Sequence, residues 1–285
     1  MYFISEVSSN HACDIERAYE FIRQSAKSGC NAVKFQLFKV EELFSKEVFV
    51  SNPEVLERKK WELPREFIPK LHEECLKNNI DFICTPFDLS SVKYLKDYVT
   101  SFKIASYELL WDDLLKECAR TGKEMIISTG MATIEEIEHA VKLLRSENVK
   151  KLTILHCSSA YPTPFDEANL SAINTIRENF NCDVGWSDHT VNAGVLYRAI
   201  IKWNASIIEF HMDLDGKGTE YKSGHCWLPN EINEVIINLK NGIKADGDGK
   251  KRPNQSEMSD RNWRADPSDG LRPIKSFRKK LVDEK

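Results

Sequence analysis

Two histidines at the ends of two short β-type runs could bind a metal ion together. His189 follows the segment G-W-S-D, and His211 ends the segment I-I-E-F-H. Asp188, Glu209 and Asp213 supply carboxylates close by. Where strands and helices alternate, the ends of successive strands lie side by side, so both imidazoles would face one cavity. Because two protein ligands leave room for water and substrate, the sequence predicts an activating divalent-metal site.

Two lysines could bind an anion at the same place. Lys34 and Lys103 lie inside β-type runs, where an unpaired ammonium group is costly to bury. They could pair with Glu6 or Glu108, or they could face a carboxylate or phosphate of a bound ligand. Three serines at strand ends could add hydrogen-bond donors for such an anion. They are Ser106, Ser128 and Ser187.

The sequence alone leaves the role of a third histidine open. His225 lies in the segment G-H-C-W, beyond the strand that ends at His211. It could contribute to the metal site, or it could pack as an ordinary loop residue.

The elements that would position these residues alternate between β-type runs and helical patterns. The β-type runs cover residues 2–6, 31–36, 81–88, 101–106, 124–129, 152–157, 182–186 and 206–211. A helical pattern follows each of them, and eight such units close into a (β/α)8 TIM barrel. Asp14 and Thr133 are predicted helix N-caps. The longest irregular connection is predicted between residues 39 and 60.

The barrel domain is predicted to span residues 1–244, because no composition break or linker interrupts that range. Residues 245–285 begin with a glycine-rich turn and clustered cations, and they are too few for a second core. We therefore expect a C-terminal tail that packs on the barrel or on a partner subunit.

Charge and hydropathy exclude several kinds of partner. The formal net charge is -4, from 40 basic and 44 acidic residues, so no overall field attracts nucleic acid. No apolar run approaches the roughly 18 residues of a membrane span. The first residues lack the pattern of a secretory signal, so a cytoplasmic location is predicted.

Beyond these general features, the chain resembles the sialic acid synthase family. The matching segments are I-S-E-V-S-S-N-H, V-K-F-Q, T-P-F-D, K-I-A-S-Y-E, S-T-G-M, H-C-S-S-A-Y-P-T-P, G-W-S-D-H-T and E-F-H-M-D, in that order. These enzymes are TIM barrels that condense phosphoenolpyruvate with an amino-sugar aldehyde to give a nine-carbon acid and phosphate. The resemblance implies a Mn²⁺ or Mg²⁺ ion at His189 and His211, and a homodimer.

The resemblance also implies roles for individual residues. Glu6 matches the family's catalytic acidic residue, and we assign Lys34, Lys103 and Glu108 to the catalytic group with it. The residues that match the phosphoenolpyruvate set are Lys34, Thr85, Lys103, Ser106, Ser128 and Ser187. Those that match the sugar-side set are Gln36, Glu108 and Tyr161. Ser159 stands where the synthases commonly have Asn, and we count it as substrate-binding.

Two other functions remain possible interpretations of the sequence. Members of the family usually carry a C-terminal antifreeze-like domain, and we expect this chain to lack it. The barrel could instead belong to a metal-dependent aldolase or hydrolase that needs no phosphoenolpyruvate. It could also be a binding protein without catalysis, although the presence of Glu6, both lysines and both histidines favours an enzyme.

Overall fold

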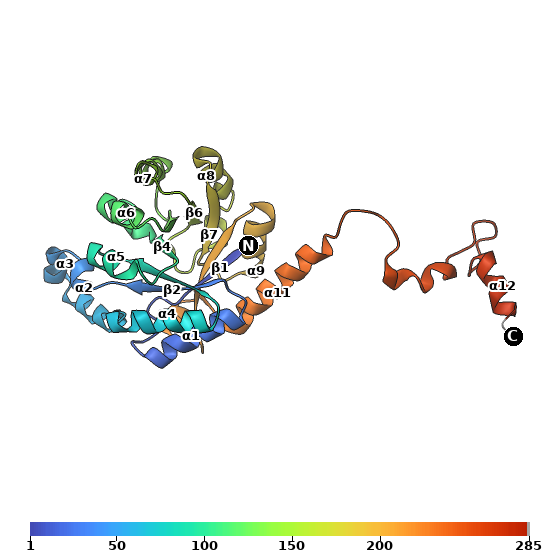
Figure 1. The fold of residues 1–285 in the computed structure, drawn as a ribbon, viewed down its shortest axis with the longest axis horizontal. Helices are drawn as coiled ribbons and strands as arrows, with labels where there is room; N and C mark the ends of the chain where they lie inside the picture. The colour runs from blue at the N-terminus through green and yellow to red at the C-terminus, as the bar shows by residue number, and fades with distance from the viewer. Residues whose placement is uncertain (284–285) are drawn as a thin grey trace. The chain divides into compact units, whose positions relative to one another are not determined.

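A closed parallel sheet forms the centre of the molecule, as the sequence predicts. The computed structural model describes residues 1–283 of the chain. Its barrel strands are β1 (Tyr2–Glu6), β2 (Ala32–Leu37), β3 (Asp81–Pro86), β4 (Ser101–Ile104), β5 (Glu124–Ser128), β6 (Leu152–Cys157), β7 (Asp183–Asp188) and β8 (Ile207–Met212). Each strand pairs in parallel with the next, and β1 pairs with β8, which closes the barrel (Figure 1). The prediction of a TIM barrel is confirmed.

A short additional strand, which the sequence analysis missed, extends this sheet. Strand β9 (Cys226–Trp227) pairs with the last two residues of β8, so that His211 lies opposite Cys226. The connection between β8 and β9 therefore folds back over the end of β8. This places residues 213–225 beside the predicted metal ligands.

Helices lie around the barrel in the connections between its strands, whereas α12 belongs to the C-terminal unit (Figure 1). The α-helices are α1 (Ile15–Lys27), α2 (Val40–Leu43), α3 (Lys46–Ser51), α4 (Ile68–Lys77), α5 (Leu89–Leu95), α6 (Asp112–Ala119), α7 (Ile134–Ser146), α8 (Ala172–Phe180), α9 (Ala193–Tyr197), α10 (Thr219–Lys222), α11 (Pro229–Ala245) and α12 (Lys275–Asp283). A π-helical turn, Arg198–Lys202, continues α9. Short 3-10 helices span Pro53–Trp61, Arg65–Phe67, Ser106–Glu108, Phe165–Glu167, Gln255–Glu257 and Asp260–Trp263.

Both predicted N-caps are confirmed. The Asp14 carboxylate accepts hydrogen bonds from the first backbone N–H groups of α1. Thr133 and Glu136 form a reciprocal capping box at the start of α7, which satisfies two otherwise unpaired N–H groups. The prediction of an irregular connection over residues 39–60 is wrong, because α2, α3 and a 3-10 helix occupy it. Their apolar side chains pack on Phe38, Val40 and Val55.

Side chains inside the barrel form two layers of opposite character. Alternate strand residues point inward, and the lower layer is apolar: Ile4, Ala32, Ile83, Ile126 and Leu155 form one buried cluster. Two residues further along the same strands, the inward positions are polar. They include Glu6, Lys34, Thr85, Ser128 and Cys157. The apolar layer thus closes the barrel below, and the polar layer faces the carboxyl ends of the strands, where barrel enzymes have their active sites.

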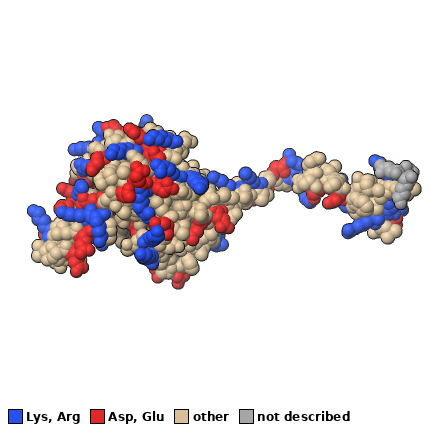
Figure 2. Space-filling model, turned by 90° about the horizontal axis from the view of Figure 1, so that it is seen from below, with Lys and Arg blue, Asp and Glu red and all other residues tan. Residues whose placement is uncertain are grey.

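The chain divides into two compact units, Met1–Leu239 and Lys240–Lys285. Within residues 1–283, no helix is both long and apolar enough to cross a bilayer. Figure 2 shows lysine and arginine side chains mixed with aspartate and glutamate over the visible surface, rather than separated into fields of one sign. The predicted packing of the tail on the barrel or on a partner subunit stays a prediction.

Candidate active site

A cavity of about 180 Å³ lies at the carboxyl ends of the barrel strands. The predicted site residues that line it are Lys34, Gln36, Lys103, Ser106, Ser128, Tyr161, Ser187, His189 and His211. Residues far apart in the sequence meet here because their strands are neighbours around the barrel. A hollow of about 470 Å³ at the opposite end is lined by residues from the strand starts, such as Tyr2, Asp81 and Glu124. No predicted site residue lines that hollow.

Two buried lysines and two buried carboxylates form a compact ionic group in the cavity floor. Lys34 Nζ lies 2.6 Å from Glu6 Oε2 and 3.6 Å from Glu209 Oε1, and Lys103 Nζ lies 3.3 Å from Glu209 Oε1. All four side chains are at most 5% exposed. The lysines therefore pair with Glu6 and Glu209, whereas Glu108 forms no ion pair with Lys103 among the described residues.

The charges in this group determine the protonation of its members. Burial raises the pKa of Glu209, but Lys103 and Lys34 outweigh burial and lower it to about 2. Burial lowers the pKa of Lys103, and Glu209 only partly opposes that effect. For Lys34, burial also favours the neutral amine, but Glu209 and Glu6 raise its pKa overall. The charged form of Lys34 is therefore favoured, and both lysines line the cavity.

Ser128, which lines the cavity with the two lysines, has a hydroxyl group without a partner among the described residues. Within residues 1–283, the buried hydroxyl oxygens of Ser128 and Ser159 have no hydrogen-bond partner. Ser106 Oγ accepts a hydrogen bond of 2.9 Å from the N–H of Gly130, and Thr85 Oγ1 accepts one of 3.4 Å from Lys34. Because buried polar groups are normally paired, unpaired hydroxyls beside two cations indicate a site for an anionic ligand.

Glu6 lies under the cavity and forms an ion pair and hydrogen bonds with residues there. Besides its ion pair with Lys34, its Oε1 accepts hydrogen bonds from Gln36 (2.7 Å) and from the N–H of Ser8 (3.0 Å). Glu108 lies outside the lining residues, in the 3-10 helix after β4. Burial raises its carboxyl pKa to about 7, and Lys103 opposes this. Glu108 can therefore exchange a proton near neutral pH.

The predicted metal ligands face one another, and their orientation fits a cation. The ring centroids of His189 and His211 are 5.3 Å apart. His189 Nδ1 donates to the Ser158 carbonyl oxygen at 2.8 Å, and His211 Nδ1 lies 2.9 Å from Glu220 Oε2. Because these oxygens only accept, each Nδ1 carries a proton, so Nε2 is the ring nitrogen available to a cation. Two such nitrogens beside carboxylates suit a divalent ion.

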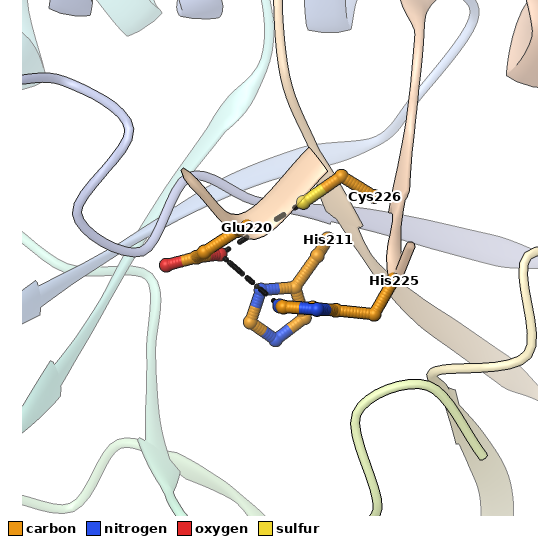
Figure 3. A group of neighbouring side chains, drawn as sticks. All are labelled: His211, Glu220, His225 and Cys226. Carbon is orange, nitrogen blue, oxygen red and sulfur yellow. Dashed lines mark hydrogen bonds and ion pairs between the residues drawn. The ribbon is translucent and has the colours of Figure 1, made fainter. Parts of the chain in front are cut away.

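His225 has both ring nitrogens occupied by protein groups. Its Nδ1 lies 3.2 Å from Ser223 Oγ, and its Nε2 lies 3.6 Å from Glu220 Oε2. The ligand atoms of His211, Glu220, His225 and Cys226 lie within 4.8 Å of one another (Figure 3). His225 thus belongs to the cluster around Glu220, which the sequence analysis did not identify.

A wider cavity of about 450 Å³ adjoins the first one, and Gln36, Tyr161 and His211 line both. The wall of the wider cavity combines polar and aromatic side chains. That wall includes Phe38, Trp61, Phe87 and Tyr107, together with Arg58. The Arg58 guanidinium stacks over Phe44 and Trp61, 5.3 and 5.5 Å from their ring centroids. The two cavities therefore provide a small site that contains two lysines and a larger one with aromatic and polar side chains, with His211 at their junction.

A family model described as the NeuB family matches residues 21–251. The chain belongs to the NeuB family. It is 39% identical to an uncharacterized protein of Methanocaldococcus jannaschii, over 90% of this chain and 75% of the relative. It is 35% identical to N,N'-diacetyllegionaminic acid synthase of Campylobacter jejuni, over 91% of this chain and 81% of that enzyme.

Solved structures agree with this assignment. N-acetylneuraminic acid (sialic acid) synthetase from Leptospira borgpetersenii, crystallised with citrate, is 32% identical. It superposes with a TM-score of 0.79, covering 91% of this chain and 89% of that one. A truncated 3-deoxy-D-arabino-heptulosonate 7-phosphate synthase from Thermotoga maritima shares the fold at 15% identity, with a TM-score of 0.66. The resemblance to the sialic acid synthase family is confirmed.

Proposed function

We propose that this protein condenses phosphoenolpyruvate with the aldehyde of an acylated amino sugar, giving a sialic-type nine-carbon acid and phosphate. One observation carries the proposal: Lys34 and Lys103 converge on a small cavity with unpaired hydroxyls, next to two histidines with free Nε2 atoms. Family membership supports it, since several relatives are named as synthases of such acids.

Phosphoenolpyruvate would bind in the smaller cavity. Its carboxylate and phosphate carry the charge that Lys34 and Lys103 can balance, and the hydroxyls of Ser128 and Ser159 would gain partners. Fixed cations in a water-excluded site also stabilise negative charge on the leaving phosphate. Thr85, Ser106 and Ser187 would complete this set, as the sequence analysis predicts.

The sugar aldehyde would bind in the wider cavity. Tyr161 and Gln36 line both cavities, so a sugar there can place its aldehyde next to the enol carbon. Aromatic rings pack against sugar rings and acyl groups, and Arg58 offers hydrogen-bond donors to the polar end of the sugar. When bound at His189 and His211, a divalent ion, Mn²⁺ or Mg²⁺, supplies Lewis-acid polarisation of an aldehyde oxygen.

The reaction requires proton transfers that buried carboxyl groups can perform. A bond forms between the enol carbon and the aldehyde carbon, water adds to the pyruvyl C2, and the C2–O bond to phosphate breaks. Glu6, which pairs with Lys34 and accepts a hydrogen bond from Gln36, would accept a proton from that water. Glu108 has a pKa of about 7 but lines neither cavity, so its role in proton transfer stays a prediction from the family resemblance.

Release of phosphate from phosphoenolpyruvate tests this function. The assay would combine Mn²⁺ with a panel of aldehyde sugars, including N-acetylmannosamine and its 6-phosphate. We expect release that depends on one sugar and is lost in Lys103→Met and His189→Ala. An aldolase or hydrolase would process the sugar without releasing phosphate. Absence of phosphoenolpyruvate binding by calorimetry would contradict the proposal outright. The homodimer and the cytoplasmic location stay predictions.

A further inference from the structure

Glu220 lies at the centre of the cluster behind His211. Its Oε2 lies 2.9 Å from His211 Nδ1 and 3.6 Å from His225 Nε2, and its Oε1 accepts a hydrogen bond of 3.1 Å from Ser9 Oγ (Figure 3). The Glu220 side chain is 18% exposed and the His211 side chain 13%.

The loop between β8 and β9 holds this carboxylate in place. At the base of the loop, fully buried Asp213 accepts hydrogen bonds from Arg17 (2.9 Å) and from the N–H of Gly218 (3.0 Å). A Cβ on Gly218 would lie 3.1 Å from Asp213 Oδ2, so a glycine allows this close approach. Gly224, with φ +90°, turns the chain back toward β9. Between these two glycines, the one-turn helix α10 places Glu220 next to His211.

The partners of Glu220 favour a supporting role over direct binding of the metal. A metal-binding histidine usually donates its second ring N–H to a carboxylate, which fixes the tautomer and makes the free nitrogen more basic. His211 meets that condition through Glu220, with Nε2 left free. His225 and Ser9 hold Glu220 in turn. Cys226 Sγ lies 3.9 Å from Glu220 Oε2, at the limit of a weak hydrogen bond.

We propose that Glu220 is a positioning residue, which orients His211 and strengthens its binding of the divalent cation. The proposal rests on the proposed function, because that function places the cation at His211. It assigns the β8–β9 loop a role in metal affinity that the strand motifs do not reveal. Removal of such a supporting carboxylate typically lowers metal affinity by about 10- to 100-fold.

Calorimetric titration with Mn²⁺ tests the proposal without measuring turnover. We expect Glu220→Ala to bind Mn²⁺ about 10- to 100-fold more weakly than the wild type. Glu220→Gln should retain most of the affinity, because its amide oxygen can still accept the Nδ1–H of His211. Glu138→Gln, which removes an exposed carboxylate on α7, is the matched control and should bind Mn²⁺ like the wild type. Circular dichroism would establish that each variant is folded.

Three results would overturn the proposal, and each has a distinct meaning. If folded Glu220→Ala bound Mn²⁺ as tightly as the wild type, Glu220 would not support His211, while the proposed function would stand. If Co²⁺ gave a thiolate-to-metal charge-transfer band that Cys226→Ser abolished, Glu220 would belong to a four-residue metal site as a ligand. If the wild type bound no Mn²⁺ at all, the metal assignment of the proposed function would fail, and this inference with it.

Discussion

Replacement of Glu209 by glutamine should destabilise the protein strongly, although it changes only one functional group. Glu209 Oε1 lies 3.3 Å from Lys103 Nζ and 3.6 Å from Lys34 Nζ, inside the barrel. Without this carboxylate, Glu6 would still pair with Lys34, but Lys103 would lose its ion pair. Because both lysines are at most 3% exposed, water cannot solvate the excess charge.

The structure gives two estimates of the cost. Breaking a buried ion pair by removing one partner typically costs about 3–5 kcal/mol. Independently, lowering the pKa of Glu209 from 4.5 to about 2 corresponds to about 3 kcal/mol of stabilisation by ionised Glu209 at neutral pH. Because this folded-state pKa is depressed, the contribution is present above pH 4.5 and is lost as the pH falls through about 2. We therefore expect a loss of about 3 kcal/mol at pH 7 in Glu209→Gln.

Urea unfolding of the wild type, Glu209→Gln and Lys103→Met/Glu209→Gln would measure the effect. The double variant removes one of the two lysines, so it should recover part of the stability that Glu209→Gln loses. A phosphate or phosphoenolpyruvate anion should stabilise Glu209→Gln more than the wild type, since it would balance the uncompensated lysine. A loss below about 1 kcal/mol, as for an exposed pair, would refute the reasoning.

Three further predictions concern stability. As the pH rises from 4.5 to about 7, the free energy of unfolding should fall by up to about 3 kcal/mol more in the wild type than in Glu108→Gln. The reason is that folding raises the pKa of the Glu108 carboxyl group and so favours its protonated form. Parallel pH profiles of the two proteins in chemical unfolding would contradict this prediction. Thr133→Ala should cost about 1 kcal/mol in urea unfolding through the lost N-cap and leave phosphate release unchanged. Gly185→Ala should lower the melting temperature markedly, because its Cβ would lie 2.4 Å from the Ile207 carbonyl oxygen; a wild-type melting temperature would exclude that clash.

The sequence predicts the barrel and the strand-borne part of the candidate site for one physical reason. Side chains alternate along a strand, so residues two apart share a face, and parallel strands end at a common rim. Lys34 and Gln36 follow this rule, and both line the cavity. The same rule could have assigned Glu209 to the lysines, because it stands two residues before His211. The sequence analysis instead treated it as a carboxylate of the metal site.

Residues in the connections could not be placed in this way. Helices α2 and α3 are too short for a periodic pattern, and packing around Val40 and Val55 stabilises them rather than local propensity. Strand β9 contains only two residues, and it pairs with the last two residues of β8, which extend beyond the pairing of β8 with β7. Such elements depend on contacts between distant parts of the chain.

Glu220 shows what this difference means for function. Nothing in the run G-T-E-Y-K-S-G-H marks its glutamate, since the run has neither strand nor helix periodicity. Its position depends on Asp213 at the base of the loop and on the pairing of His211 with Cys226 across two strands. A strand pattern can identify a metal ligand such as His211. The Glu220 carboxylate, which sets the tautomer of His211, lies in a loop, and only the tertiary structure places it beside the histidine.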